Sequence, residues 1–262
     1  MKESIIDIQL VRFIAAYLFI ILLLFLIRVR GIKREKRIFI ASIRMTLQLV
    51  LVGYILSYIF ENPNPITTLV IILIMEAFAI YNVYKQIQLK GYLQLQRVIA
   101  VAMLLGTLFT LFYFNFVVVQ FNPWYDPRYF IPIAGMIIGN TMTGVSLGIK
   151  SLLEGFRQER FLIEGALMLG AKPEVAVKSI VNDSFDSAIL PTINSMVGMG
   201  IIFLPGMMTG QILSGTSPLI AIEYQIVVLL GIAGSVGISV FIALHYGVRT
   251  FFNEKSQLRI DA

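Results

Sequence analysis

The 262 residues are 58% hydrophobic and only 14% charged, with a mean hydropathy of +0.84, which excludes an ordinary soluble domain. The chain contains no cysteine, so thiol catalysis and thiolate metal ligands are excluded. The net charge of +6 lies in short blocks between apolar runs, with no basic face interleaved with aromatics, which argues against a nucleic-acid partner. We therefore expect one integral membrane domain, residues 1–262.

The apolar runs, taken in chain order, predict about seven membrane-spanning helices. The first run follows an acidic N-terminus and precedes the basic stretch "RVRGIKREKR", the reverse of a signal peptide, so we expect a retained anchor. The sixth run carries two prolines and several glycines, and both a continuous helix and a kinked or broken one are open for it. The predicted spans are residues 10–27, 38–60, 66–84, 98–119, 129–149, 189–208 and 221–246.

The positions of Lys and Arg predict which loops face the cytoplasm. Most of them lie after the first, third and fifth spans and in the C-terminal tail, whereas the opposite side holds Lys2 and Arg128. An odd number of spans, with the N-terminus outside and the C-terminus in the cytoplasm, fits this pattern. The expected fold is an all-α polytopic helical bundle in the cell membrane, with a cytoplasmic segment over residues 150–188.

This cytoplasmic segment contains the string "IEGALMLGA". Its spacing predicts a short helix that stops near Gly170, with a second helix starting after Pro173. The small residues Gly165 and Ala166 let another surface approach the backbone closely, and Glu164 adds a charge at the same place. A docking helix has this composition. An amphipathic helix lying on the membrane surface is the alternative.

The string resembles the E-A-A-x-x-x-G motif of ABC-transporter permeases, with one Ala-to-Gly change at Gly165. The resemblance implies a coupling helix that docks in a cleft of an ATP-binding subunit. The residues it assigns to ATPase coupling are Glu164, Gly165, Ala166 and Gly170. The sequence departs from the motif downstream, because Ile180 has the usual spacing but the expected Leu-Pro comes only at Leu190 and Pro191.

Four strings spread over most of the chain look like the FetB (YbbM) family of permeases, which has plant relatives linked to aluminium tolerance: "IRMTLQL", "IPIAGMIIGNTMTGVSLGIKSL", "EGALMLGA" and "LPTINSMVGMGIIFLPGMMTGQILSGTSPLIAIEYQI". The resemblance implies an iron-export permease that works with a FetA-type ATP-binding subunit. The chain has no Walker-type G-x-x-x-x-G-K-[ST], so ATP and Mg²⁺ are expected on that partner and no cofactor on this chain. A span set of this size suggests a homodimer surrounded by lipid.

Ionisable residues inside membrane spans are costly and are usually paired or functional. For Glu76 two interpretations are open: an ion pair with Arg44 that stabilises the bundle, or a cation ligand or proton acceptor on the translocation pathway. Glu223 is either an interfacial carboxylate that reaches water or a metal-ion gate at the outer end of the last span. The other ionisable residues in or near spans are Asp7, Arg12 and His245. The lone histidine is a weak metal candidate.

Span five carries amide and hydroxyl side chains among two Gly-x-x-x-Gly steps, which is typical of a tightly packed helix seam. The alternative is that Asn140, and Asn194 in span six, face the translocation pathway. Four methionines cluster in and after span six: Met196, Met199, Met207 and Met208. Thioethers suit cuprous ions, but methionine also fills irregular gaps, so we expect packing. The carboxylate and amide inventory favours a hard or borderline cation as the transported metal.

A stand-alone secondary transporter or channel for a cation or small solute is the alternative function. Such a protein more often shows two similar halves with paired broken helices, and the sequence contains no evident internal repeat. A membrane enzyme or assembly scaffold is the third possibility. Because an enzyme needs a nucleophile with a base, or a metal constellation, the chain is expected not to be an enzyme.

Overall fold

The computed structural model describes residues 9–89, 92–253 and 255–258. Lys2 and Asp7 lie outside the described residues. The chain divides into an N-terminal unit, Met1–Pro63 with Leu213–Gly215, and a larger unit, Asn64–Ile212 with Thr216–Ala262. The expectation that residues 1–262 form one membrane domain stays a prediction.

The N-terminal unit consists of three helices: α1 Leu10–Ala16, α2 Leu18–Val29 and α3 Glu35–Glu61. The junction of α1 and α2 lies at Tyr17, whose hydroxyl is hydrogen-bonded to the Thr46 hydroxyl of α3. Most of the large apolar side chains in these helices are exposed. In a membrane such faces contact lipid. The first two predicted spans, residues 10–27 and 38–60, are thus present as apolar helical segments long enough to cross a bilayer.

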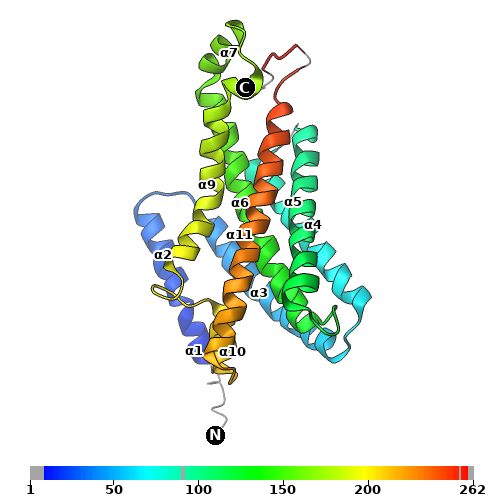
Figure 1. The fold of residues 1–262 in the computed structure, drawn as a ribbon. Helices are drawn as coiled ribbons and strands as arrows, with labels where there is room; N and C mark the ends of the chain where they lie inside the picture. Colours follow the sequence, from blue (N-terminus) through cyan, green and yellow to red (C-terminus); the bar gives the residue numbers. More distant parts are fainter. Residues whose placement is uncertain (1–8, 90–91, 254, 259–262) are drawn as a thin grey trace. The chain divides into compact units, whose positions relative to one another are not determined.

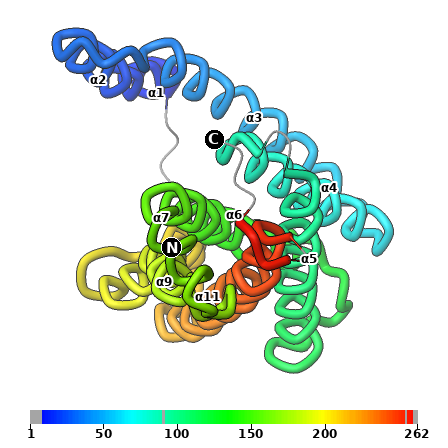
Figure 2. The backbone as a smooth tube through the Cα atoms, turned by 90° about the horizontal axis from the view of Figure 1, so that it is seen from above, coloured from blue at the N-terminus to red at the C-terminus, as the bar shows by residue number. Residues whose placement is uncertain are grey.

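The larger unit contains α4 Pro65–Ile87, α5 Leu93–Tyr113 with its π-helical extension η1 Phe114–Val119, α6 Pro127–Gln158, α7 Arg160–Met168, α8 Pro173–Ala176, α9 Lys178–Gly198, α10 Gly206–Leu213 and α11 Pro218–Arg249. Helix α6 packs against α4, α9 and α11, and α11 also packs against α5 (Figures 1 and 2). The side chains of Asn64 and Asp126 cap α4 and α6, each followed by a proline at the first helical position.

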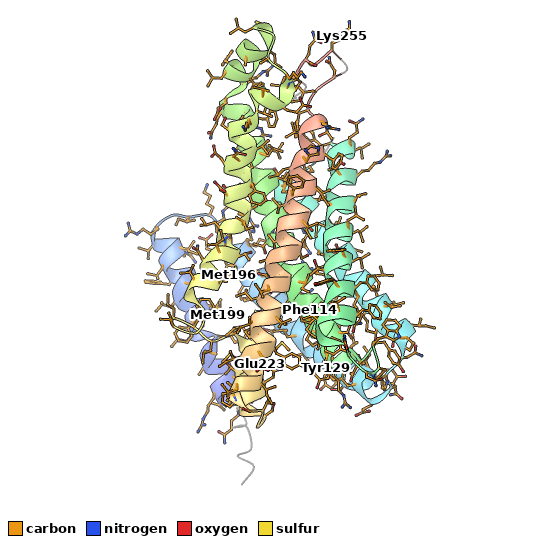
Figure 3. The ribbon with its side chains drawn as sticks, viewed as in Figure 1. Phe114, Tyr129, Met196, Met199, Glu223 and Lys255 are labelled. Atoms are coloured by element: carbon orange, nitrogen blue, oxygen red, sulfur yellow. The ribbon has the colours of Figure 1, made fainter. Side chains whose placement is uncertain are left out.

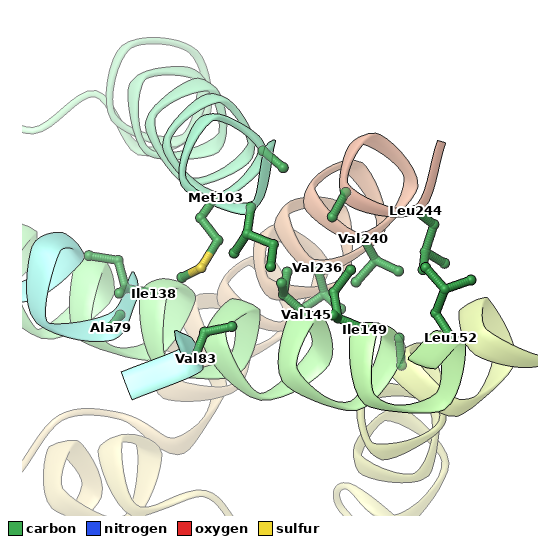
Figure 4. Close-up of a cluster of buried hydrophobic side chains, with 14 of the residues drawn as sticks. Ala79, Val83, Met103, Ile138, Val145, Ile149, Leu152, Val236, Val240 and Leu244 are labelled. Carbon is green, nitrogen blue, oxygen red and sulfur yellow. The ribbon is translucent and has the colours of Figure 1, made fainter. Parts of the chain in front are cut away.

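The apolar core of the larger unit lies between α4, α5, α6 and α11 (Figure 4). Close helix approach depends on glycine: a Cβ on Gly144 would lie 2.6 Å from Val236, and one on Gly148 would lie 3.1 Å from the Ala188 Cβ. A Cβ on Gly139 meets nothing within 4 Å. The tightly packed seam expected in span five is therefore confirmed at the second Gly-x-x-x-Gly step.

Helix α5 has no room for a Cβ at Gly106, where it faces Ser239 of α11. A Cβ there would lie 1.9 Å from Ser239 Oγ and 3.1 Å from the Ser239 backbone nitrogen, so rotating the hydroxyl is not enough to make room. We expect Gly106→Ala to lower the free energy of unfolding by about 1–3 kcal/mol, measured as a lower thermal midpoint in detergent. Gly237→Ala, where a Cβ meets nothing within 4 Å, is the control. Equal midpoints for both variants would contradict the expectation.

The sixth span differs from its predicted bounds, residues 189–208. Helix α9 starts at Lys178 and ends at Gly198, so residues 178–188, where helical spacing predicted a helix in the cytoplasmic segment, are continuous with span six. Hydropathy does not extend the span over these residues because they are polar. The hydroxyls of Ser184 and Ser187 nevertheless donate to carbonyl oxygens one turn earlier in the same helix, at 2.6 and 2.7 Å. These side chains therefore need no partner outside α9.

The sixth span is broken, which decides between the two interpretations that the sequence leaves open. After Gly198 the chain leaves the helix, with Gly200 at φ +82°, and becomes helical again only in α10. Pro191 lies inside α9, so the late Leu-Pro pair belongs to a continuous helix and not to a linker.

Six helical segments of the described chain are long and apolar enough to cross a membrane: Leu10–Val29, Glu35–Glu61, Pro65–Ile87, Leu93–Val119, Pro127–Gln158 and Pro218–Arg249. With its 21 residues, α9 is a further helix of that length, but it is more polar. The all-α membrane bundle with about seven spans is therefore confirmed. Within the larger unit, α7 lies at the same end as Lys255, and Glu223 lies toward the opposite end (Figures 1 and 3).

Candidate functional site

Helix α7 ends in a turn that requires glycine. Gly170 has φ +90°; its N–H donates to the Leu167 carbonyl, and the Ala171 N–H donates to the Ala166 carbonyl, both at 3.0 Å. These two hydrogen bonds form the Schellman motif, in which the residue after the helix is left-handed. The predicted helix end is confirmed, and α8 begins at Pro173 as expected.

Only one side of α7 packs against the rest of the larger unit. Ile163 is 1% exposed and belongs to the apolar core. The outward side of α7 and the turn that follows carry apolar side chains that are 65–91% exposed: Phe161, Leu162, Met168, Leu169 and Val175. We call this surface the α7 patch. Helix α7, which carries it, lies at one end of the larger unit (Figure 1).

Glu164, the charged residue of the "IEGALMLGA" string, lies beside the α7 patch. Glu164 Oε1 accepts a hydrogen bond from Arg160 Nε at 2.9 Å in an (i, i+4) ion pair, and both side chains are partly exposed. Glycine inside a helix costs about 1 kcal/mol relative to alanine. Gly165 nevertheless stands inside α7, where a Cβ would meet nothing within 4 Å. Packing within the described chain therefore does not explain why this residue is so small.

Glu76 is the most buried ionisable side chain of the predicted pathway set. It lies in α4 with 2% exposure, and neither carboxylate oxygen has a hydrogen-bond partner among the described residues. The Thr107 hydroxyl of α5 lies close to it but donates to the Met103 carbonyl at 2.7 Å. Arg44 belongs to α3 in the N-terminal unit, so the predicted Arg44–Glu76 ion pair stays a prediction.

The other pathway candidates are exposed and lie on separate helices. Asn140 of α6 donates to the Met136 carbonyl of its own helix at 2.7 Å. Asn194 is exposed on α9, and Glu223 is exposed near the start of α11. No hydrogen bond or ion pair joins any two of the four candidates within the part of the chain that the structure describes. Their roles in transport and metal binding stay predictions.

Among the described residues, His245 belongs to no group of three or more His, Asp or Glu side chains that could hold a metal ion. The imidazole of His245 stacks on Phe241 of the same helix, with ring centroids 5.9 Å apart. Arg12 is exposed on α1.

Besides the Glu76 carboxylate, four buried polar atoms have no hydrogen-bond partner among the described residues, and sequence reasoning did not single them out as unpaired. They are Asn115 Oδ1, Ser146 Oγ, Gln225 Oε1 and Ser239 Oγ. For Gln225 a signal existed, because the helical period places it on one face with Ala221 and Val228, both fully buried. The serines gave no comparable signal, since serine is common in membrane helices.

A bundle of membrane-length helices with a short, partly exposed helix at one end defines a multi-pass helical membrane protein. The chain belongs to the family described as "Uncharacterised protein family (UPF0014)", whose model matches residues 10–252. No solved structure matches the chain significantly.

Three relatives cover most of the chain. A "UPF0014 membrane protein" of Synechocystis is 34% identical over 240 residues, 90% of either chain. The "Probable iron export permease protein FetB" of Escherichia coli is 33% identical over 86% of this chain and 85% of its own. The Arabidopsis thaliana "Protein ALUMINUM SENSITIVE 3" is 32% identical over 94% of this chain and 88% of its own. The resemblance found in the sequence is therefore confirmed.

Proposed function

We propose that this chain is the permease subunit of an ABC transporter in the cytoplasmic membrane. A separate ATP-binding subunit drives it, and the cargo is a metal ion, with iron export as the specific activity. The α7 patch is the observation that carries the proposal. The name of the Escherichia coli relative, "Probable iron export permease protein FetB", supports the same activity for this chain. On this proposal the chain is not an enzyme, because ATP hydrolysis belongs to the partner.

The composition of α7 fits a protein cleft. Exposed apolar side chains on both sides of a small residue present area that a partner can bury, and Gly165 lets a partner backbone approach. Glu164 supplies a charge for orientation beside this contact. A helix lying on the membrane surface is the competing arrangement, but lipid contact gives no reason for glycine inside the helix.

The position of α7 fits the transmission of force. It joins the end of α6 at Gln158 to α8 and the start of α9 at Lys178. Two residues anchor this segment in the larger unit. Ile163, in α7, and Val177, just before α9, are each 1% exposed. A displacement of α7 therefore moves α6 and α9 together, because these two helices pack against each other. Rigid helices with packed contacts can carry such a movement into the membrane.

The exposed faces of α6 and α9 support a homodimer. Asn140 and Thr143 are exposed on α6, and Asn182, Asp186 and Asn194 are exposed on α9. Polar side chains facing hydrocarbon are unfavourable, whereas they are common where spans face another chain or a water-filled path. We therefore assign these faces to the partner permease and the pathway, with Asn140 and Asn194 as pathway residues.

The carboxylates are the proposed cation ligands. An unpaired charge buried like that of Glu76 costs several kcal/mol, so its site needs a cation, either a proton or the transported ion. Glu223 is exposed near the start of α11, at the end of the larger unit that is opposite to α7 (Figure 3). This position suits release of the ion. Carboxylate oxygens favour hard or borderline cations, which include iron.

Proteoliposomes that contain the permease with its ATP-binding subunit test this function. With the ATP-binding subunit facing outward, ⁵⁵Fe²⁺ is expected to accumulate in the lumen only when Mg-ATP is added outside. Vesicles lacking the ATP-binding subunit, and vesicles given a non-hydrolysable nucleotide, are the controls. Equal flux in the controls would favour the stand-alone transporter or channel and overturn the coupled mechanism.

A further inference from the structure

A cavity of about 400 Å³ opens where the helix of span six is interrupted. Its walls come from the end of α9, the segment that follows, α10 and α11. Three methionines and one amide line it, namely Met196, Met199, Met208 and Gln225. Met196 and Met199 lie at the end of α9 that is nearer to Glu223 (Figure 3). All of these residues belong to the larger unit.

The methionines do not act here as packing filler. A filler side chain occupies the gap beside it, whereas these three border a space that stays open. Met207 serves as an internal comparison, because it packs against the apolar core and is not among the residues lining the cavity. Met207 therefore matches the sequence-based expectation of packing, while the other three belong to the lining of an open cavity.

The amide supplies an independent sign of a ligand. Gln225 is 6% exposed, and its Oε1 has no hydrogen-bond partner among the described residues. A buried carbonyl oxygen without a partner costs about 1–3 kcal/mol. This oxygen belongs to a residue that lines the cavity, so an occupant that accepts its lone pair removes the penalty. A cation satisfies that requirement, whereas an aliphatic solute does not.

The ligand set selects the kind of cation. Thioethers are soft, neutral donors that prefer monovalent copper and its analogue silver over hard ions. The remaining lining is aliphatic, including Leu204, Ile222 and Ile226, and it contains no carboxylate. A divalent hard cation would lose its water there without gaining a compensating charge. A monovalent soft ion has the smaller dehydration cost and gains sulfur ligands.

We propose that Met196, Met199, Met208 and Gln225 form a binding site for a soft monovalent metal ion, Cu⁺ or Ag⁺. Each methionine has three rotatable bonds, so the three sulfur atoms can converge on one ion inside the cavity. Gly200, with φ +82°, also lines the cavity and lets the chain turn after α9. The site is separate from the carboxylates proposed for iron, and it needs neither ATP nor the partner subunit.

Silver binding to the purified full-length permease tests the site, since Ag⁺ does not oxidise in air as Cu⁺ does. Equilibrium dialysis in chloride-free buffer, with metal and protein quantified, is expected to give one tightly held Ag⁺ per chain. The triple variant Met196→Leu/Met199→Leu/Met208→Leu is expected to weaken this binding at least tenfold. Leucine keeps the volume of methionine nearly constant. Gln225→Leu is expected to weaken binding severalfold.

Met207→Leu is the matched control, because it removes a neighbouring thioether whose residue does not line the cavity. The affinity of this variant for Ag⁺ is expected to equal that of the wild type. Unchanged Ag⁺ binding in the triple variant would overturn the proposal, as would equal losses in the triple variant and the control. A ¹³C-methyl-methionine NMR titration of the wild type gives a result even where the triple variant fails to fold. Ag⁺ must shift the methyl signals of Met196, Met199 and Met208 and leave that of Met207 in place.

This readout is also independent of the proposed function. A failed silver titration leaves ATP-driven iron transport untouched, and failed iron transport leaves the titration result standing.

Discussion

Reversing the charge of Glu164 is expected to abolish co-purification of the permease with its ATP-binding subunit and to eliminate ATP-dependent transport. Glu164 is paired with Arg160 at 2.9 Å on the exposed helix α7, so Glu164→Arg places two cations side by side at the proposed docking surface. Loss of an exposed ion pair changes folding stability by only about 0–1 kcal/mol. Membrane insertion and the thermal midpoint should therefore stay at wild-type values.

Glu154→Arg provides a matched control. Glu154 forms the same kind of (i, i+4) ion pair, with Lys150 at 3.8 Å on α6, and its reversal changes the net charge of the protein by the same amount. It is expected to retain the ATP-binding subunit. If Glu164→Arg still captures that subunit in wild-type yield, α7 is not the docking helix, and a membrane-surface helix becomes the better description.

The variant Glu76→Gln is expected to lower metal-ion flux at least tenfold, about 1.4 kcal/mol in transition-state terms, without loss of stability. The carboxylate is 2% exposed and has no hydrogen-bond partner among the described residues. An amide of the same shape removes the cost of burying a charge but cannot hold a cation by charge. The flux assay in proteoliposomes and a thermal midpoint in detergent measure the two effects separately.

The Arg44–Glu76 ion pair predicts a different outcome. Removing one partner of a buried pair costs about 3–5 kcal/mol, so Glu76→Gln and Arg44→Gln would each lower the thermal midpoint, and the charge swap Arg44→Glu/Glu76→Arg would restore it. Wild-type flux together with a lowered midpoint in Glu76→Gln would therefore remove Glu76 from the pathway and assign it a structural role.

Much of the bundle could be predicted because apolar length is a local property. The long helices α3, α4, α6 and α11 follow runs that are visible in the sequence, and capping residues with proline mark the starts of α4 and α6. Helix α9 shows where this reasoning fails. Its first half is polar, so hydropathy does not extend span six over it. Its hydroxyls are satisfied by carbonyl oxygens of their own helix, and small residues allow close packing on α6.

The candidate sites show the same contrast between features that local sequence predicts and features that need the tertiary structure. The stop of α7 at Gly170 follows from one residue that tolerates a left-handed backbone, so local sequence sufficed. The cavity at the interrupted helix did not follow from sequence, because Met196 and Met208 lie on either side of the break and Gln225 comes from α11. Only the tertiary arrangement tells a methionine that fills a gap from one that borders a cavity.

The polarity of α9 also bears on how the protein is made. With Asp183, Asp186 and several hydroxyls in its first half, α9 partitions poorly into a bilayer by itself. It can enter by sliding along α6, which is synthesised earlier and offers Gly144 and Gly148 as a close contact for Ala188. The close contact at these glycines therefore gives α9 a packing surface that is already in place when α9 is synthesised.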